Sequence, residues 1–299
     1  MYGFLRVLAL LIIIGVIGLA GFWFVTRPDT LPDDTFTALS GDAEAGEAVF
    51  WAGGCASCHA APGAEGDEER LVLAGGQTFA TEFGSFVAPN ISPTEAGIAG
   101  WSVDDLGNAM MRGVSPEGQH YYPAFPYTSY SRAAPQDIAD LHAFLQTLPA
   151  SDVANQPHDI GFPFSIRRLL GGWKMLFFRD DWVVTDVAAD DVARGRYLVE
   201  SLGHCSECHT PRNAIGGLDK GRWMAGAPSP DGKGKVPAIT PDALDWSAGD
   251  IAAYLETGFT PEFDSAGGEM ADVVQNLSHL PKSDLETIAA YLKVLPASE

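Results

Sequence analysis

The sequence predicts an all-α protein in which two copies of one helical unit follow an N-terminal membrane helix. Three observations lead to this fold class. An uncharged apolar run of 19 residues extends from Val7 to Val25. Further on, a cysteine-containing pentapeptide occurs twice, as CASCH and as CSECH. The segments that follow the two pentapeptides match one another in order and spacing, which indicates an internal repeat.

The composition sets limits on size and partners. The chain has 299 residues, of which 46% are hydrophobic, and this is enough for two ordinary cores. Its 39 Asp and Glu against 18 Lys and Arg give a formal net charge of −21. A charge of this sign repels nucleic acid and anionic lipid headgroups. We therefore expect no nucleic-acid partner, and we expect protein partners with neutral or basic surfaces.

The N-terminal apolar run has the length of a membrane span. At about 1.5 Å per residue it reaches close to the roughly 30 Å of a bilayer's hydrocarbon core. A cleaved signal peptide is the alternative, since Gly18, Leu19 and Ala20 offer a small-residue cleavage site, but the apolar run continues beyond them. We expect residues 1–27 to form an uncleaved anchor and residues 28–39 to form an extended tether to an exported, acidic domain.

All four cysteines belong to the two pentapeptides, and each pentapeptide ends in a histidine. The residues are Cys55, Cys58 and His59 in the first and Cys205, Cys208 and His209 in the second. The C-x-x-C-H pattern is typical of c-type haem attachment, in which both thiols bind the porphyrin and the histidine ligates the iron. Disulfides, or one zinc bound by four cysteines, would explain the cysteine pairs but not the two histidines. The sequence predicts two covalently bound haem c groups.

The same helical plan surrounds each pentapeptide. A helix precedes each one, with Asp42 as the N-cap of the first and Asp190 opening the second. Gly46 and Gly195 occupy the same place in these two helices. Each copy closes with an amphipathic helix, DIADLHAFLQTLP in the first and DLETIAAYLKVLP in the second.

The register of the repeat is constant after the pentapeptides. Three pairs of residues are each separated by 145 positions, namely Trp101 with Trp246, Gly113 with Gly258, and Phe125 with Met270. We therefore expect two domains, residues 40–150 and residues 188–299. Residues 151–187 then form a connector between them.

With these motifs, each half resembles a class I cytochrome c domain. The tandem is similar to membrane-anchored dihaem cytochromes and to the cytochrome subunits of periplasmic alcohol and gluconate dehydrogenases. The resemblance covers both predicted domains. It implies that the first and last helices of each domain cross with a glycine against an aromatic ring, Gly46 against Phe144 and Gly195 against Tyr291.

The resemblance also implies the axial ligands of the haem irons. His59 and His209 are the proximal ligands. In the second half, the segment AGGEMADVVQNLSHL resembles the family's distal segment, so Met270 is expected to bind the iron opposite His209. The 61 residues between them are enough for the chain to pass around the haem edge.

The distal ligand of the first haem is the open question in this sequence. Related first-domain loops contain YPAMPY with methionine as the ligand, whereas this chain has YPAFPY, and Phe125 cannot coordinate iron. Three alternatives follow. His120 binds and gives bis-histidine ligation; Met110 or Met111 on the middle helix binds; or the iron is five-coordinate and Phe125 fills the pocket.

The connector differs from both repeats in composition. From Gly161 to Arg179 it has four basic residues and no acidic one, together with many aromatic side chains. One interpretation is a short helix that joins the two domains, with arginines paired to haem propionates. The other is a patch that lies on the bilayer or docks a membrane partner.

Together these features predict an electron carrier of a respiratory chain. We expect a cytochrome tethered to the inner membrane and facing the periplasm. It would carry single electrons from a dehydrogenase or a quinol-oxidising complex to a terminal acceptor such as an oxidase, without bond-making chemistry of its own. The alternative is a dihaem peroxidase-like enzyme in which the first haem has an open site.

Overall fold

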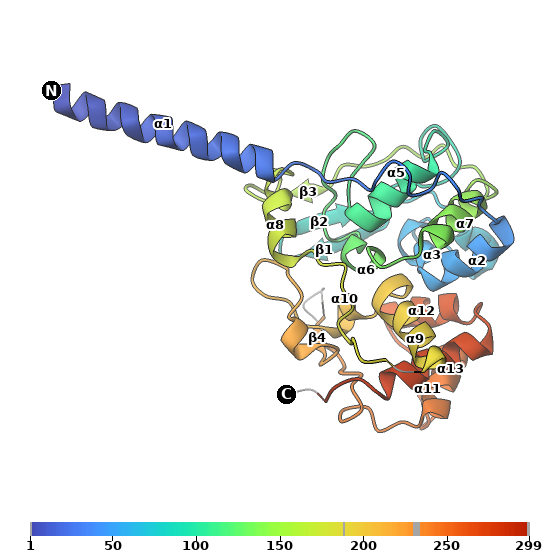
Figure 1. Ribbon diagram of the computed structural model, residues 1–299. Coiled ribbons are helices and arrows are strands. Elements are labelled where there is room, and N and C mark those ends of the chain that lie inside the picture. Colours follow the sequence, from blue (N-terminus) through green and yellow to red (C-terminus); the bar gives the residue numbers. More distant parts are fainter. Residues whose placement is uncertain (1, 188, 230–233, 298–299) are drawn as a thin grey trace.

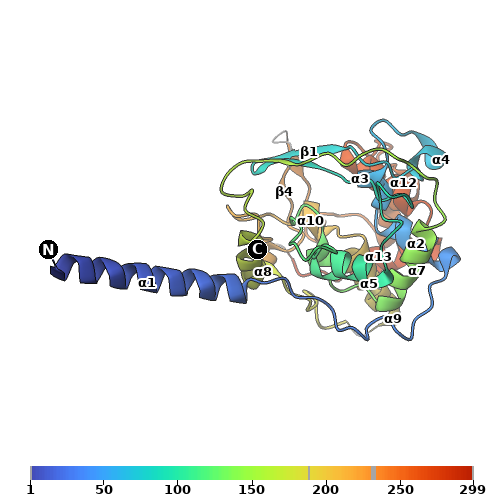
Figure 2. The ribbon, with the colours of Figure 1, turned by 90° about the horizontal axis from the view of Figure 1, so that it is seen from above.

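The computed structural model describes residues 2–187, 189–229 and 234–297. Helix α1 (Tyr2–Val25) projects away from a helical body, as Figure 1 shows, and none of its residues is buried. Figure 2 shows the same projection from above. The length and apolar composition of α1 suffice for a membrane span, with a mean hydropathy of 2.7. The expected apolar N-terminal helix is therefore present, and it begins five residues before Val7.

Short helices build the two halves of the body, and both halves share a first helix, an attachment helix, a middle helix, a helix in the distal segment and a closing helix, while the π-helical turn lies at a different place in each. In the first half (residues 40–150) they are α2 (Ala43–Ala52), α3 (Cys55–His59), α4 (Gly66–Arg70), α5 (Val103–Gly107), the π-helical turn η1 (Asn108–Arg112), α6 (Tyr127–Tyr130) and α7 (Pro135–Leu145). In the second half (residues 189–297) they are α9 (Asp190–Tyr197), the π-helical turn η2 (Leu198–Leu202), α10 (Ser206–His209), the 3-10 turn η3 (Lys220–Arg222), α11 (Ala248–Thr257), α12 (Glu269–Leu277) and α13 (Lys282–Leu292). Figure 1 shows the two halves packed side by side.

The first and last helices of each half cross at a glycine. A methyl group added to Gly46 of α2 would overlap the carbonyl of Asp140 on α7, and it would lie 2.8 Å from Cβ of Phe144. Gly195 of α9 has the same relation to α13, where the added methyl would lie 2.8 Å from Cβ of Tyr291. Only glycine lets the two backbones approach this closely. Both crossings have the partners that the sequence predicts.

Five short strands are a departure from the all-α expectation in the described part of the chain. They are β1 (Thr78–Thr81), β2 (Gly84–Val87), β3 (Asp159–Ile160), β4 (Ala227–Pro228) and β5 (Lys235–Val236). The first three form one antiparallel sheet and the last two form another. Strands of two to four residues are too short to show a period of two in the sequence, so the pattern could not predict them.

The connector contains one helix, α8 (Leu169–Phe177), and this helix contacts the end of the anchor. The Arg168 guanidinium lies 4.4 Å from the centre of the Trp23 ring and donates a hydrogen bond to the Trp23 carbonyl. Gly171 of α8 packs so closely on Thr26 that an added Cβ would overlap the Thr26 carbonyl. The end of α1 is therefore held by the connector rather than hanging free.

The helix crossings give a direct test by substitution. We expect Gly195→Ala to lower the free energy of unfolding by about 1–3 kcal/mol, because the methyl overlaps the backbone of α13. Gly249→Ala is the matched control, since Gly249 is exposed in the first turn of α11 and alanine favours helix there. Thermal unfolding of the haem-loaded protein measures both. Equal unfolding temperatures for the two variants would contradict the close crossing.

Candidate haem sites

A left-handed residue directly precedes the first cysteine of each C-x-x-C-H motif, and each motif forms a short helix, which includes Cys55 in α3 and begins one residue after Cys205 in α10. Gly54 has φ of 63° before α3, and His204 has φ of 41° before α10. The equivalence of these positions extends the repeat into the backbone conformation. A histidine is rare in this region and is held there by the hydrogen bond between its Nδ1 and the Leu202 carbonyl, at 3.0 Å.

The two motif histidines have equivalent partners and the same free nitrogen. Nδ1 of His59 lies 2.8 Å from the carbonyl oxygen of Pro89, and Nδ1 of His209 lies 2.8 Å from that of Pro237. Burial lowers the pKa of both imidazoles and so favours the neutral form. In this form Nδ1–H donates to the carbonyl and Nε2 keeps the lone pair that binds a metal. The donor set therefore fits an axial ligand of haem iron at both positions.

The state of the cysteines fits thioether attachment. All four thiols are free, so no disulfide pairs them. Burial raises the pKa of Cys55, Cys58 and Cys205 to about 12 and that of Cys208 to about 11. Within the described residues, no group of three or more His, Cys, Asp and Glu side chains is arranged to hold a metal ion. The structure thus gives no support to the disulfide or zinc alternatives.

Met270 lies in the first turn of α12, after Gly268, whose φ is 58°. Its side chain is half-buried and packs against the same apolar core as Cys205. Helix α12 also contacts α2 and α3 of the first half. The helix that carries the expected distal ligand of the second haem is therefore positioned by the first attachment motif.

Phe125 occupies the corresponding place in the first half, beside the first attachment helix. Its ring is half-buried and lies 5.9 Å from the rings of both Tyr121 and Tyr130, measured between centroids. Tyr130 is buried, and its hydroxyl donates to the carbonyl of Gly53 at 2.8 Å, two residues before Cys55. Phe125 is thus held between two tyrosine rings, one of which is bonded to the residue pair that precedes the first motif.

His120 is held at the anchor instead. Its side chain is 3% exposed, and Nε2 lies 2.8 Å from the carbonyl oxygen of Thr26 at the end of α1. Arg167 of the connector donates to the His120 carbonyl at 3.0 Å. Figure 1 shows α8 and the end of α1 on the opposite side of the first half from α3. Ligation by His120 would require this buried hydrogen bond to break.

The other two candidates for the first distal ligand are core residues. Met110 and Met111 lie on η1 and are 4% and 8% exposed, packed in the main apolar cluster. Their burial agrees with a role in packing the core. The equivalent residues of the second half, Leu255 and Glu256, favour the same role, because neither is a methionine.

Each attachment motif is hydrogen-bonded to the other half of the protein, through the residue before its second cysteine. Ser57, which precedes Cys58, accepts a hydrogen bond from Nδ2 of Asn276 on α12 at 2.6 Å. Glu207, which precedes Cys208, accepts hydrogen bonds from the hydroxyls of Thr128 and Ser129 on α6, at 2.7 and 2.9 Å. Each attachment motif is thus tied to the segment that follows the distal position of the other half.

Further contacts at this interface bring the two attachment helices close together. Helix α12 of the second half packs against α3, which carries the first motif. Arg70 donates to Asp272 at 2.8 Å and to Asn276 at 3.1 Å, and the Trp51 ring stacks on His279 at 3.8 Å. One interface therefore contains both motifs.

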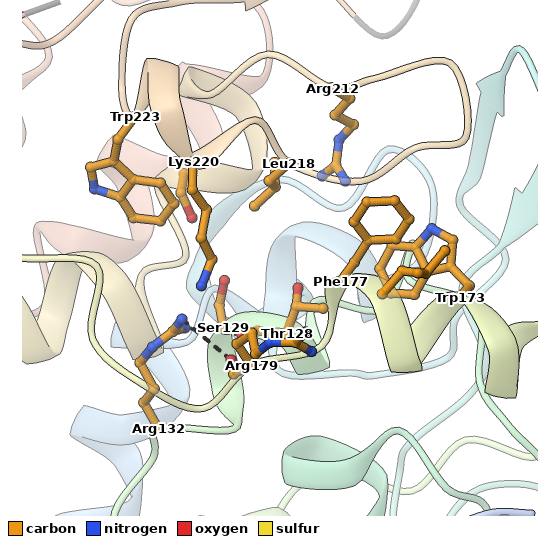
Figure 3. A pocket seen from close by; sticks show the side chains of 12 residues that line it. Thr128, Ser129, Arg132, Trp173, Phe177, Arg179, Arg212, Leu218, Lys220 and Trp223 are labelled. Carbon is orange, nitrogen blue, oxygen red and sulfur yellow. Dashed lines mark hydrogen bonds between the residues drawn. The ribbon is translucent and has the colours of Figure 1, made fainter. Parts of the chain in front are cut away.

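A cavity of about 300 Å³ lies behind the second attachment helix, between it and the connector. Figure 3 shows Trp173 and Phe177 of α8 on one side and Trp223 on the other. Four basic side chains line it, which are Arg132, Arg179, Arg212 and Lys220. Arg132 donates to the carbonyls of Thr128 and Glu200, and Arg212 is paired with Glu207. The inner face of α8 thus joins the two halves.

The comparisons with known proteins agree with this geometry. The family model of cytochrome c matches residues 43–149. A dihaem c-type cytochrome of Cereibacter sphaeroides is 60% identical, over 95% of this chain and 96% of its own length. The fructose dehydrogenase cytochrome subunit of Gluconobacter japonicus is 34% identical, over 81% of this chain and 50% of its own.

A further relative is the gluconate 2-dehydrogenase cytochrome c subunit of Pantoea cypripedii, which is 34% identical over 89% of this chain and 63% of its own length. This chain therefore spans only about half to two thirds of these two dehydrogenase subunits. Such relatives are electron-transfer subunits and not the catalytic chains. The chain belongs to the cytochrome c family, as a dihaem c-type cytochrome that binds two covalent haem c groups and transfers electrons rather than acting as an enzyme.

Proposed function

We propose that this protein is a membrane-tethered, periplasm-facing cytochrome of the inner membrane. It takes single electrons from a dehydrogenase or a quinol-oxidising complex and passes them to a redox protein acceptor. The dehydrogenase cytochrome subunits among its relatives support the class of donor. The exposed apolar helix α1 supports the tether.

The proposal assigns one haem to each half of the body. Cys55, Cys58 and His59 hold the first, in a domain of residues 40–150. A second domain, residues 188–299, holds the other through the residues Cys205, Cys208, His209 and Met270. When bound, each haem supplies an iron that accepts and releases one electron. Support comes from the repeated contacts of the two histidines with Pro89 and Pro237 and from the repeated glycine crossings.

Direct transfer between the two sites is the central part of the proposal, and one observation carries it. The residue before the second cysteine of each motif bonds across the interface, Ser57 to Asn276 and Glu207 to Thr128 and Ser129. The thioether edges of both haems are attached to these helices, so we infer that they face the same interface. Electrons then pass within the chain instead of requiring two separate encounters with partners.

The second site is expected to have a six-coordinate iron whose ferrous state Met270 stabilises, because a thioether ligand raises the reduction potential of a haem. On the first site, we propose that Phe125 fills the distal side and that His120 remains bonded to Thr26. The peroxidase-like alternative finds no counterpart among the relatives described above.

Axial ligation can be tested by electron paramagnetic resonance of the oxidised protein. We expect a high-spin signal from the first haem and a low-spin signal from the second. Met270→Leu should remove the low-spin signal and the sulfur-to-iron charge-transfer band of the optical spectrum. His120→Ala should leave both haem signals unchanged. Loss of a low-spin signal in His120→Ala would instead establish bis-histidine ligation of the first haem.

The buried carboxylate of Glu207 should set the potential of the second haem. The Glu207 side chain is 10% exposed, and its negative charge stabilises the ferric state of a nearby haem. We therefore expect Glu207→Gln to raise the potential of the second haem by an amount on the order of tens of millivolts and that of the first by less. Redox titration measures both potentials.

An exposed glutamate provides the control for this titration. Glu286 lies on the outer face of α13, so Glu286→Gln changes the net charge equally but away from the interface. The two haem reduction potentials of Glu286→Gln should match those of the unsubstituted protein, because water and salt screen an exposed charge. Equal shifts in the two variants would mean that the position of Glu207 has no special effect.

A further inference from the structure

The exposed apolar side chains of the body gather around the connector. Outside α1, eleven large apolar side chains of the described residues are strongly exposed, and six of them lie between positions 162 and 176. These six are Phe162, Phe164, Ile166, Leu169, Met175 and Leu176. Ile215 adds a seventh, since its carbonyl accepts a hydrogen bond from the Trp173 ring at 2.9 Å. A gathered apolar surface of this kind marks an interaction site.

Helix α8 turns its apolar face outward. Leu169, Met175 and Leu176 are 42%, 57% and 63% exposed. The charged Lys174 faces inward instead, where its Nζ donates to the carbonyls of Arg112 and Gly113 at 2.6 and 2.8 Å. The inner side of α8 is apolar too, with Trp173 and Phe177, whereas a surface helix in water normally has polar side chains on its outer side. The outer face of α8 therefore fits an apolar environment rather than solvent.

This apolar face lies where the anchor leaves the membrane. Arg168, directly before α8, stacks on Trp23, and Gly172 lies within van der Waals reach of the Phe22 ring. His120 bonds the Thr26 carbonyl, which fixes the last turn of α1 against the body. Tryptophan at the end of a span is typical of the headgroup region. A bilayer that contains α1 would thus meet α8 at its surface.

The charge of the segment suits an anionic bilayer. Four basic residues and no acidic one lie from Gly161 to Arg179, in a chain whose formal net charge is −21. Lys174 is bonded inside the body, so the positive charges beside the apolar face are those of Arg167 and Arg168. Arg27 adds another, since it directly follows Thr26, which packs on Gly171 of α8. Basic side chains beside an apolar face bind phosphate headgroups while the apolar groups enter the acyl boundary.

We propose that residues 162–176, together with Ile215, lie in the headgroup region of an anionic phospholipid bilayer. The segment is a second membrane contact, and together with the fixed junction between α1 and the body it sets how the haem-bearing body is oriented against the bilayer. This inference rests on the proposed membrane tether, and it adds that the body lies against the bilayer along one defined face.

The test uses the full-length, haem-loaded chain in vesicles of phosphatidylcholine and phosphatidylglycerol. All native cysteines are bonded to haem in this protein, so Leu176→Cys carries the only free thiol. In the structure Leu176 is 63% exposed and Val294, outside this surface, is 50% exposed. We expect a membrane-impermeant maleimide to modify Leu176→Cys at least tenfold more slowly than the control variant Val294→Cys in the same vesicles.

The outcomes separate this inference from the tether itself. Flotation of the protein with the vesicles tests the anchor first, and failure to float overturns the tether. Flotation with full reactivity of Leu176→Cys overturns the bilayer contact and leaves the tether standing. Protection that occurs in native membranes but not in pure lipid vesicles also overturns the inference, because it assigns the surface to a protein partner. Haem absorbance of each variant confirms that the fold is retained.

Discussion

The hydrogen bonds that join each attachment motif to the opposite half determine much of this structure. Ser57 and Glu207 hold equivalent positions, directly before the second cysteine of each motif, and each bonds to a helix of the other half. The Ser57 and Glu207 side chains must point into the interface, and not into solvent, to make these hydrogen bonds. The constraint therefore orients both short attachment helices toward one interface, and it places α6 and α12 across that interface.

The interface also makes the two sites unequal. Ser57 is neutral, whereas Glu207 carries a charge: burial raises its pKa, but Arg212 and Thr128 outweigh that effect and lower it overall. The distal positions differ as well, with Phe125 in the first half and Met270 in the second. A repeated unit has thus acquired different surroundings at its two copies, and a difference in reduction potential gives electron flow a direction.

Much of the architecture could be predicted from the sequence because it depends on local patterns. The C-x-x-C-H spacing predicted the two haem attachment motifs, and the constant separation of Trp101 from Trp246 predicted the repeat, whereas the short helices that the motifs form were not predicted. The bond between Ser57 and Asn276 could not be predicted, since it joins residues 219 positions apart with no pattern linking them. His120 was a reasonable ligand candidate by its position in the loop, but burial against Thr26 depends on how the anchor packs.

Electron transfer between the two haems of one molecule is the property on which the proposed function depends most. Pulse radiolysis of the purified dihaem protein, which reduces the haems unevenly within microseconds, measures this directly. We predict that electrons then redistribute between the two haems at a first-order rate that does not change with protein concentration. A redistribution rate that rises in proportion to protein concentration would show that the two haems exchange electrons only between molecules, and it would contradict the shared interface.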